Sequence, residues 1–304
     1  MSTYIICGPT ASGKSALALD IACHLKGHVL NADSMQLYKE LPILSAQPFL
    51  IDQQKVPHLL YGSFSVTERG SVGKWLTLVE HNLKTKDISC PVFVGGTGLY
   101  INALLEGLSP IPDTPPDVRA KLTEILSGNS PEYMFNLLKT QDPLTASQID
   151  PHNTHRILRA LEVIQFTKKP LAEWQQIPRE KKISFPSPIK VILIEPDRQA
   201  LHKVINNRVE QMIDKGAIKE VLKLKDNHIL PSTTACKTIG YEDIYAYLRG
   251  YLSQEEMIEQ IQQKTRQYAK RQITWFRHQI KPDFIWPKIY HQSDWPTVLS
   301  EMKW

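Results

Sequence analysis

The sequence predicts an α/β fold, a doubly wound parallel sheet that is interrupted by an all-helical insertion. Over the first 108 residues, apolar β-prone runs alternate with helical patterns, which favours parallel strands joined by helices. Only helical patterns occur between residues 117 and 180, and a buried strand follows at 189–196. Prolines cluster on both sides of the helical stretch, which indicates a separate part of the chain.

The first elements follow one another closely. The apolar run TYIICG at residues 3–8 predicts a strand, and the apolar stripe in 15–25 has helical spacing. The segment HVLNAD, residues 28–33, predicts a second short strand that ends at an acid. Residues 34–60 contain three prolines, so we predict irregular structure there.

The remaining elements of the sheet and its helices are predicted in the same way. Residues 72–86 and 99–108 have helical patterns, and between them CPVFVGGTG, residues 90–98, predicts a buried strand that ends in glycines. After the strand at 189–196 we expect helices near 198–225, 240–250 and 254–279 and a short strand at 283–286.

The proline clusters set the expected domain boundaries. SPIPDTPPD, residues 109–117, has four prolines in nine residues, and Pro186 and Pro188 follow the helical stretch. We therefore place an α/β core at 1–113 and 187–304 and a helical insertion at 114–186.

Composition and charge exclude several classes of protein. Hydrophobic residues make up 42% of the chain, but no apolar run is long enough to span a membrane. The N-terminus has no signal-peptide pattern, and the four cysteines form no C-x-x-C pair, so we expect reduced thiols in a cytoplasmic protein. We expect no membrane partner and a monomer.

A complete phosphate-binding motif lies between the first predicted strand and helix. It reads Gly8-x-x-x-x-Gly13-Lys14-Ser15, and glycines allow such a loop to point its backbone N–H groups at phosphate oxygens. The start of the helix adds its positive dipole end, Lys14 adds a cation, and Ser15 is the expected ligand of Mg²⁺. The predicted phosphate-binding residues of this P-loop are Gly8, Pro9, Thr10, Ala11, Ser12, Gly13, Lys14 and Ser15.

The motif does not by itself identify the phosphate compound. A nucleotide-hydrolysing P-loop enzyme normally ends a second buried strand with an acid that holds magnesium, whereas the strand at 90–98 ends in Gly95-Gly96-Thr97. The strand-end acid near the loop is Asp33. An acid there fits a metal ligand, a base for an incoming nucleophile, or a turn or helix cap.

Several motifs together resemble those of the bacterial tRNA dimethylallyltransferases, the IPP transferase or tRNA isopentenyltransferase family. The resemblance runs, with gaps, from residue 3 to about residue 280. The segments that carry it are GPTASGKS at 8–15, Asp33-Ser34 followed by Tyr38, GGTGLY at 95–100, LLEGLSPIPDTPPDVR at 104–119, HRILRALEV at 155–163 and AKRQITW at 269–275.

The resemblance implies a P-loop NTPase-like fold and a reaction. Members of the family transfer a dimethylallyl group from dimethylallyl diphosphate to N6 of adenosine 37, typically in tRNAs that read codons beginning with U. The P-loop would then hold the diphosphate of an allylic donor, with Mg²⁺. Asp33 and Thr97 would be the catalytic residues, with Asp33 as the base that accepts the N6 proton. Thr97 and Arg208 would lie beside the diphosphate.

The resemblance also implies a set of tRNA contacts, in which the helical insertion contacts the tRNA and the anticodon stem-loop is the part of the tRNA that is bound. The implied residues are Asp33, Ser34, Met35, Gln36, Thr97, Arg119, His155, Arg156, Ile157, Leu158, Arg159, Arg266, Lys270, Arg271 and Arg277.

Helical geometry supports the last group independently. No acid occurs from Gln260 to Pro282, and Arg266, Lys270 and Arg277 share one helix face. Ile261, Tyr268 and Trp275 recur every seven residues on another face. This pattern predicts a core-facing seam and a cationic ridge that can follow phosphates, against the alternative of a solvated face.

One departure from the family pattern is clear. Where the family usually has glycine-threonine-alanine-lysine-proline, this chain has Leu44-Ser45-Ala46-Gln47-Pro48, so Gln47 replaces a lysine.

Three alternative functions stay open at this point: a small-molecule P-loop kinase, an adenylate dimethylallyltransferase acting on free nucleotides, and a P-loop protein that binds nucleic acid without catalysis. The acceptor that is modified, or ATP turnover with a small alcohol, distinguishes them.

Overall fold

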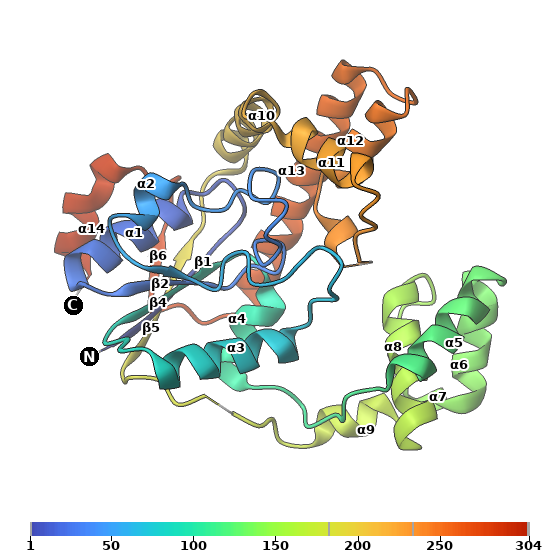
Figure 1. Cartoon of the computed structure of the whole chain (residues 1–304). Helices are drawn as coiled ribbons and strands as arrows, with labels where there is room; N and C mark the ends of the chain where they lie inside the picture. Colours follow the sequence, from blue (N-terminus) through green and yellow to red (C-terminus); the bar gives the residue numbers. More distant parts are fainter. Residues whose placement is uncertain (1, 182, 233, 303–304) are drawn as a thin grey trace. The chain divides into compact units, whose positions relative to one another are not determined.

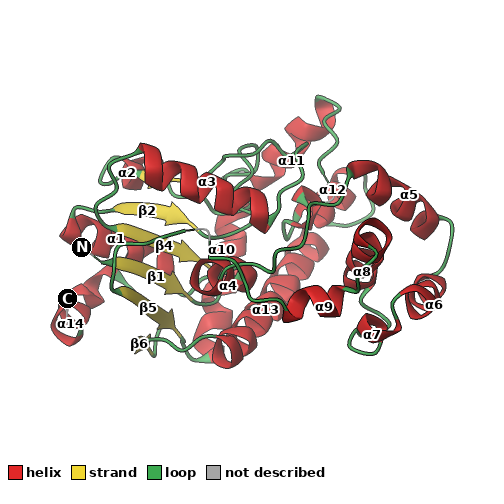
Figure 2. Cartoon of the chain, turned by 90° about the horizontal axis from the view of Figure 1, so that it is seen from below, coloured by secondary structure: helices red, strands yellow, loops and turns green. Residues whose placement is uncertain are grey.

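Parallel strands form the sheet of the larger of two compact units, within a computed structural model that describes residues 2–181, 183–232 and 234–302. The strand order is β3-β2-β4-β1-β5-β6, and every pairing is parallel. Figure 2 shows β2, β4, β1, β5 and β6 side by side in this order. The predicted doubly wound parallel sheet is confirmed. The strands are β1 (Thr3–Cys7), β2 (His28–Asn31), β3 (His58–Leu59), β4 (Pro91–Gly95), β5 (Ile189–Ile194) and β6 (Phe284–Trp286).

The helices of this unit pack on both faces of the sheet. Figure 1 shows α1 (Lys14–Leu25) and α14 (Trp295–Glu301) on one face and α3 (Val72–Thr85) and α4 (Gly98–Glu106) on the other. Alternate side chains of a strand point to opposite faces, so Tyr4 and Ile6 pack with α1. The remaining helices of the unit are α2 (Leu50–Gln53), α10 (Arg198–Asp214), α11 (Ala217–Asp226), α12 (Tyr241–Leu248) and α13 (Gln254–Gln279).

Two expectations for the larger unit were wrong in detail, and one helix was missed. Residues 34–60 are not wholly irregular, because they contain α2 and the short edge strand β3. The helix expected near 198–225 is two helices, separated where Gly216 adopts a left-handed conformation with φ 106°. The sequence did not reveal α14, whose Val298 is buried against the sheet.

The second unit runs from Glu106 to Lys181 and is all-helical. Its boundaries lie upstream of those placed at 113/114 and 186/187. Leu108 and Glu180 pair through their backbones, with Glu180 N donating to Leu108 O at 2.9 Å, so the proline-rich segment 109–113 lies inside the unit. Its helices are α5 (Pro116–Ser127), α6 (Pro131–Gln141), α7 (Pro143–Ala146), α8 (Thr154–Thr167) and α9 (Leu171–Gln176).

The helical unit has its own apolar core and a buried polar anchor. Leu122, Leu138 and Leu161 are fully buried together. The carboxylate of Asp142 accepts hydrogen bonds from the backbone amides of Thr145 at 2.9 Å and Leu171 at 3.2 Å. Among the described residues, no helix of either unit combines the length and apolar character needed to cross a bilayer.

Candidate functional site

The P-loop follows β1 and leads into α1, as predicted, at the edge where the carboxyl ends of the strands meet. Gly13 caps α1 in a left-handed conformation with φ 90°. A Cβ at Gly13 would collide with the carbonyl oxygen of Tyr290, so this position excludes any side chain. The hydroxyl of Ser12 is buried and has no hydrogen-bond partner among the described residues. Such a loop leaves polar groups for a ligand that is anionic.

Two cations flank this loop. Lys14 Nζ donates to the carbonyl oxygen of Pro9 at 3.1 Å, and burial lowers the Lys14 pKa to about 8, an effect that Asp33 opposes and Arg208 reinforces. Burial also lowers the pKa of Arg208, again against the attraction of Asp33. The guanidinium of Arg208 has no hydrogen bond or ion pair to another described residue. A diphosphate would add negative charge close to both groups, neither of which forms an ion pair with a described residue.

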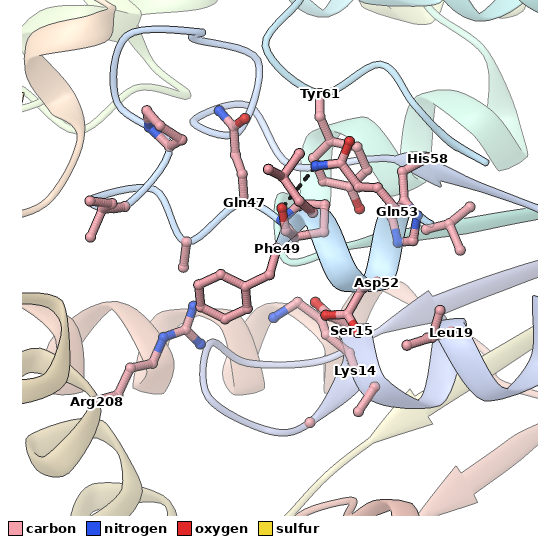
Figure 3. Close-up of a pocket in the computed structure, with 18 of the residues that line it drawn as sticks. Lys14, Ser15, Leu19, Gln47, Phe49, Asp52, Gln53, His58, Tyr61 and Arg208 are labelled. Atoms are coloured by element: carbon pink, nitrogen blue, oxygen red, sulfur yellow. Dashed lines mark hydrogen bonds between the residues drawn. The ribbon is translucent and has the colours of Figure 1, made fainter. Parts of the chain in front are cut away.

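A pocket of about 660 Å³ opens beside the P-loop. Figure 3 shows Lys14 from the P-loop and Arg208 from α10 directed into it. Its wall also contains Gln47, Phe49 and Tyr61, and it has more apolar than polar surface. This combination of two cations with an apolar wall suits a ligand that has an anionic head and an apolar tail.

Asp33 and Thr97 lie on neighbouring strand ends and are joined through Ser34. The backbone amide of Ser34 donates to Thr97 Oγ1 at 3.0 Å, and the two hydroxyls are 3.3 Å apart. Asn31 holds the Asp33 backbone on both sides, accepting from its N–H at 2.8 Å and donating to its carbonyl at 3.0 Å. One carboxylate oxygen of Asp33 accepts from Met35 N at 3.0 Å, and its second oxygen is not engaged by any described residue. The geometry fits a carboxylate held ready to accept a proton.

The segment after Asp33 is fixed by its own side chains. Gln36 donates to the carbonyl oxygens of Ser45 and Ala46, at 3.2 and 2.8 Å. Met35 accepts a hydrogen bond at its sulfur from Thr238 at 3.4 Å. The amide of Gln36 is therefore occupied by the loop that follows it, while the segment itself is only partly buried.

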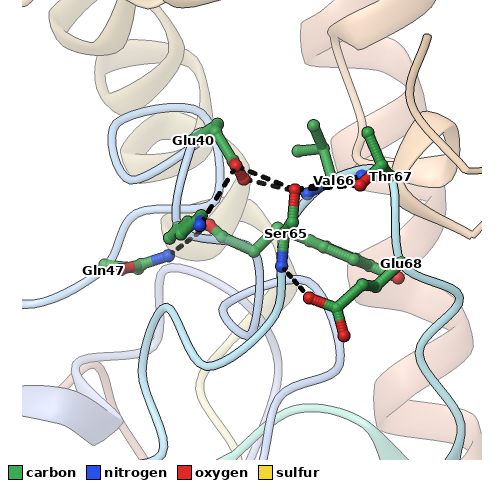
Figure 4. A network of polar contacts seen from close by, with 8 residues as sticks. Glu40, Gln47, Ser65, Val66, Thr67 and Glu68 are labelled. Carbon is green, nitrogen blue, oxygen red and sulfur yellow. Dashed lines mark hydrogen bonds and ion pairs between the residues drawn. The ribbon is translucent and has the colours of Figure 1, made fainter. Parts of the chain in front are cut away.

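Gln47, which replaces the family lysine, has a structural partner. Its amide donates to the carbonyl oxygen of Tyr38 at 2.8 Å, beside the network in which Glu40 accepts from Ser65 Oγ at 3.0 Å and from Val66 N at 2.9 Å (Figure 4). Gln47 also lines the pocket. The loop thus keeps its path without the cation.

Tyr290, in the C-terminal segment, supports the P-loop, and no sequence motif indicated this contact. The Tyr290 backbone amide donates to the carbonyl of Ser12 at 3.0 Å, and its hydroxyl donates to Asp20 at 2.6 Å. Tyr290 is buried against α1 and β6. The tyrosine has no sequence spacing that links it to residue 12, so only the fold reveals it.

The long helix α13 differs from the predicted seam and ridge. Ile261 is buried as predicted, but Tyr268 and Trp275 are partly exposed. Burial and the charge of Asp33 raise the pKa of the Tyr268 hydroxyl, and hydrogen bonds with Thr97 and Gln272 oppose the shift. Tyr268 therefore faces the site and not the core.

Two of the three cations in the predicted ridge have partners in the structure. Arg266 donates to Asn206 Oδ1 at 2.6 Å, and Arg277 forms an ion pair with Glu195. Lys270 and Arg271 remain exposed, with Arg271 over the ring of Tyr268. RNA phosphates would therefore meet Lys270 and Arg271 directly, and would meet Arg266 and Arg277 beside their protein partners.

In the helical unit, two of the three arginines implied as tRNA contacts, Arg119 and Arg159, share a buried partner. The carboxylate of Glu162 pairs with Arg119 and lies 3.4 Å from Arg159, which also donates to Thr114 at 2.9 Å. His155 and Arg156 are exposed at the start of α8, and Leu158 is partly buried. Ile157 is completely buried in the core of the unit, so its side chain is not available for the tRNA contact that the resemblance implied.

The oxygen groups around the P-loop fit Mg²⁺ held jointly with a phosphate ligand. Ser15 is exposed at the pocket, and the carboxylate of Asp52 lines the same pocket. Among the described residues there is no cluster of three or more histidine, cysteine or acidic side chains that could hold a metal alone. Mg²⁺ commonly binds through few protein oxygens together with water and substrate phosphates, so this sparse set is suitable.

Comparison with known proteins decides the family. The IPP transferase family matches residues 36–279, and the isopentenyl transferase family matches residues 1–61.

The chain belongs to the IPP transferase family.

Among its relatives are the tRNA dimethylallyltransferases of Mesorhizobium japonicum and Bartonella henselae. The first is 41% identical over 305 residues, which cover 99% of this chain and 93% of the relative. The second is 44% identical over 281 residues, which cover 92% and 97%. The tRNA isopentenylpyrophosphate transferase of Bacillus halodurans has a similar solved structure, with 30% identity and a TM-score of 0.66 over 99% of this chain and 95% of that one.

A structure of a eukaryotic dimethylallyltransferase acting on tRNA is also similar. It is 27% identical with a TM-score of 0.72, over 90% of this chain and 69% of that one. The IPP transferase fold is therefore present here over nearly the whole chain.

Proposed function

We propose that this IPP transferase moves a dimethylallyl group from dimethylallyl diphosphate to N6 of adenosine 37 in tRNAs that read codons beginning with U. The main support is that Asp33 and Thr97 lie beside a P-loop whose Lys14 and Arg208 form no ion pair with another described residue. Relatives that cover almost the same length are named tRNA dimethylallyltransferases, which supports the transfer of a dimethylallyl group to tRNA.

The chain's own groups account for each step. The P-loop amides and the cations Lys14 and Arg208 bind the diphosphate and stabilise it as it leaves. The free carboxylate oxygen of Asp33 accepts the proton of the N6 amine. A bond forms between N6 and the first carbon of the dimethylallyl group, while the bond from that carbon to the diphosphate oxygen breaks and its electron pair leaves with the diphosphate.

Ser15 and Asp52 would hold Mg²⁺, which supplies additional positive charge against the departing diphosphate. Thr97 holds the Ser34 amide and thereby keeps Asp33 in place. The target adenine must leave the stack of neighbouring RNA bases to reach this edge of the sheet, because its N6 is otherwise inaccessible.

Surface charge supports RNA as the acceptor. Lys270 and Arg271 on α13 are exposed, and so is Arg156 on α8. We propose that these residues, with His155, contact the anticodon stem-loop, and that the enzyme acts as a cytoplasmic monomer. A free nucleotide would need no such surface, which favours tRNA over AMP as the acceptor.

An acceptor comparison tests the proposal. The protein is incubated with Mg²⁺ and labelled dimethylallyl diphosphate together with unmodified tRNA or AMP, and ATP turnover is measured in parallel with small alcohols. We expect label in tRNA alone. Label in AMP alone, or ATP turnover without prenyl transfer, would contradict the proposal.

A further inference from the structure

Gln272 joins two turns that carry the chemistry of the site. It lies on the buried face of α13, and only 5% of its surface is exposed. Its Oε1 accepts from the backbone amide of Thr10 at 2.8 Å, and its Nε2 donates to the carbonyl oxygen of Gly96 at 2.8 Å. Since Thr10 belongs to the P-loop and Gly96 precedes Thr97, one side chain connects the diphosphate cradle to the Thr97 turn.

The bridge continues the sheet where its backbone pairing stops. The β1 and β4 ladder ends at the pair of Cys7 and Gly95, because the P-loop then turns away. Just beyond this pair, the Gln272 side chain offers one acceptor and one donor to the two backbones, as the backbone of a neighbouring strand would. It also occupies the Thr10 amide, which the sequence had assigned to phosphate.

A second hydrogen bond extends this connection to the carboxylate. Thr97, next to Gly96, accepts from the Ser34 amide at 3.0 Å, and Ser34 follows Asp33. Beyond the backbone pairing of the sheet, Gln272 thus links the end of β1 to that of β4, and Thr97 links the end of β4 to that of β2.

The contact between α13 and this turn leaves no space for adjustment. A Cβ on Gly96 would collide with Nε2 of Gln272, and a Cβ on Gly98 would collide with the ring of Trp275. The glycines therefore allow the helix to lie directly against the turn, and the amide of Gln272 has one orientation that satisfies both partners.

We propose that Gln272 is a positioning residue that sets the separation between the diphosphate cradle and the Asp33 carboxylate. It does not contact the reacting atoms, because both polar ends of its side chain are engaged by the backbone. The inference rests on the proposed function, in which N6 must lie between the leaving diphosphate and the base. Misplacement by about 1 Å reduces a rate about 100-fold when reacting groups must be aligned.

The test perturbs the bridge from both sides. Gln272→Leu removes both backbone hydrogen bonds at similar volume, together with the contact to the Tyr268 hydroxyl. Gly96→Ala displaces the amide without adding a charge. The control is Gln254→Leu, an exposed glutamine in the first turn of the same helix. For each full-length variant we would measure kcat, the Kd for tRNA and the thermal midpoint, with kcat taken well below that midpoint.

We expect kcat to fall about 10- to 100-fold in Gln272→Leu and in Gly96→Ala. The Kd for tRNA should stay within about twofold, and the double variant should be no slower than the slower single one, because both changes break the same bridge. The control should retain the wild-type kcat.

A kcat within about twofold of wild type in folded Gln272→Leu would overturn the inference, as would strictly multiplicative losses in the double variant. If Gln272→Leu does not fold, Gly96→Ala gives the same decision, since wild-type kcat in that variant also overturns it. Absence of transfer by the wild-type enzyme would instead contradict the proposed function.

Discussion

Replacing Asp33 with asparagine removes the proton acceptor and preserves the turn that holds it. The amide oxygen of asparagine can still accept the bond that Met35 N makes to the carboxylate at 3.0 Å, and Asn31 still holds the backbone. A positioned base contributes about 100- to 10,000-fold to a rate. We therefore expect kcat to fall by that factor, or about 2.7–5.5 kcal/mol in activation free energy.

A second, smaller effect follows from the charge. Asp33 raises the pKa of Lys14, so its neutralisation lets that pKa fall further below about 8. The KM for the donor should rise as a result, and more so at pH 8 than at pH 7. The binding of tRNA should change by less than about twofold, because the polar contacts of the turn are unchanged.

The assay is single-turnover transfer at saturating donor and tRNA, with tRNA binding measured separately. Asp87→Asn is the matched control, because Asp87 is exposed at the opposite end of β4. The control should react at the wild-type rate. A kcat within about threefold of wild type for Asp33→Asn would refute the role of Asp33 as the base.

Three further predictions concern charge. Burial lowers the Lys14 pKa to about 8, and a bound anion raises it. Affinity for inorganic diphosphate should therefore be full below pH 8 and should fall above it by up to about tenfold per pH unit. Calorimetry that shows constant affinity from pH 7 to 9.5 would contradict this. Lys270→Ala should weaken tRNA binding and reduce the slope of log K against log salt by about 0.7–0.9, and an unchanged slope would remove Lys270 from the interface. Glu162→Ala should lower the free energy of unfolding in urea by about 2–3 kcal/mol, which is less than for a fully buried pair because Arg159 is 38% exposed. The control Glu124→Ala, at an exposed position, should change this free energy little. Equal stability of the two variants would count against the pairing.

The elements that short-range pattern determines were predicted well. The strand before the P-loop and α1 follow from apolar spacing and from the glycines beside them, and the 26-residue α13 follows from its spacing alone. The structure has all three where expected. The sheet order is consistent with alternating strands and helices, since all strands are parallel. Short segments such as β3 escaped prediction, because two residues carry no periodicity.

Long-range partners could not be predicted from spacing. Arg266 and Arg277 have the spacing of an exposed cationic face, but Asn206 and Glu195 from other elements engage them. Ile157 lies within the HRILR motif that implied RNA contact, yet the helix turns its side chain into the core. Gln272 and Tyr290 reach the P-loop only because the chain returns to it more than 260 residues later.

We propose that this P-loop holds an allylic diphosphate for transfer to a tRNA base. Incubation with labelled dimethylallyl diphosphate, Mg²⁺ and unmodified tRNA, followed by nuclease digestion and identification of the labelled nucleoside, tests this directly. We expect label on N6 of adenosine 37 in tRNAs that read codons beginning with U. Label at another position or nucleoside, or no label in tRNA, would contradict it.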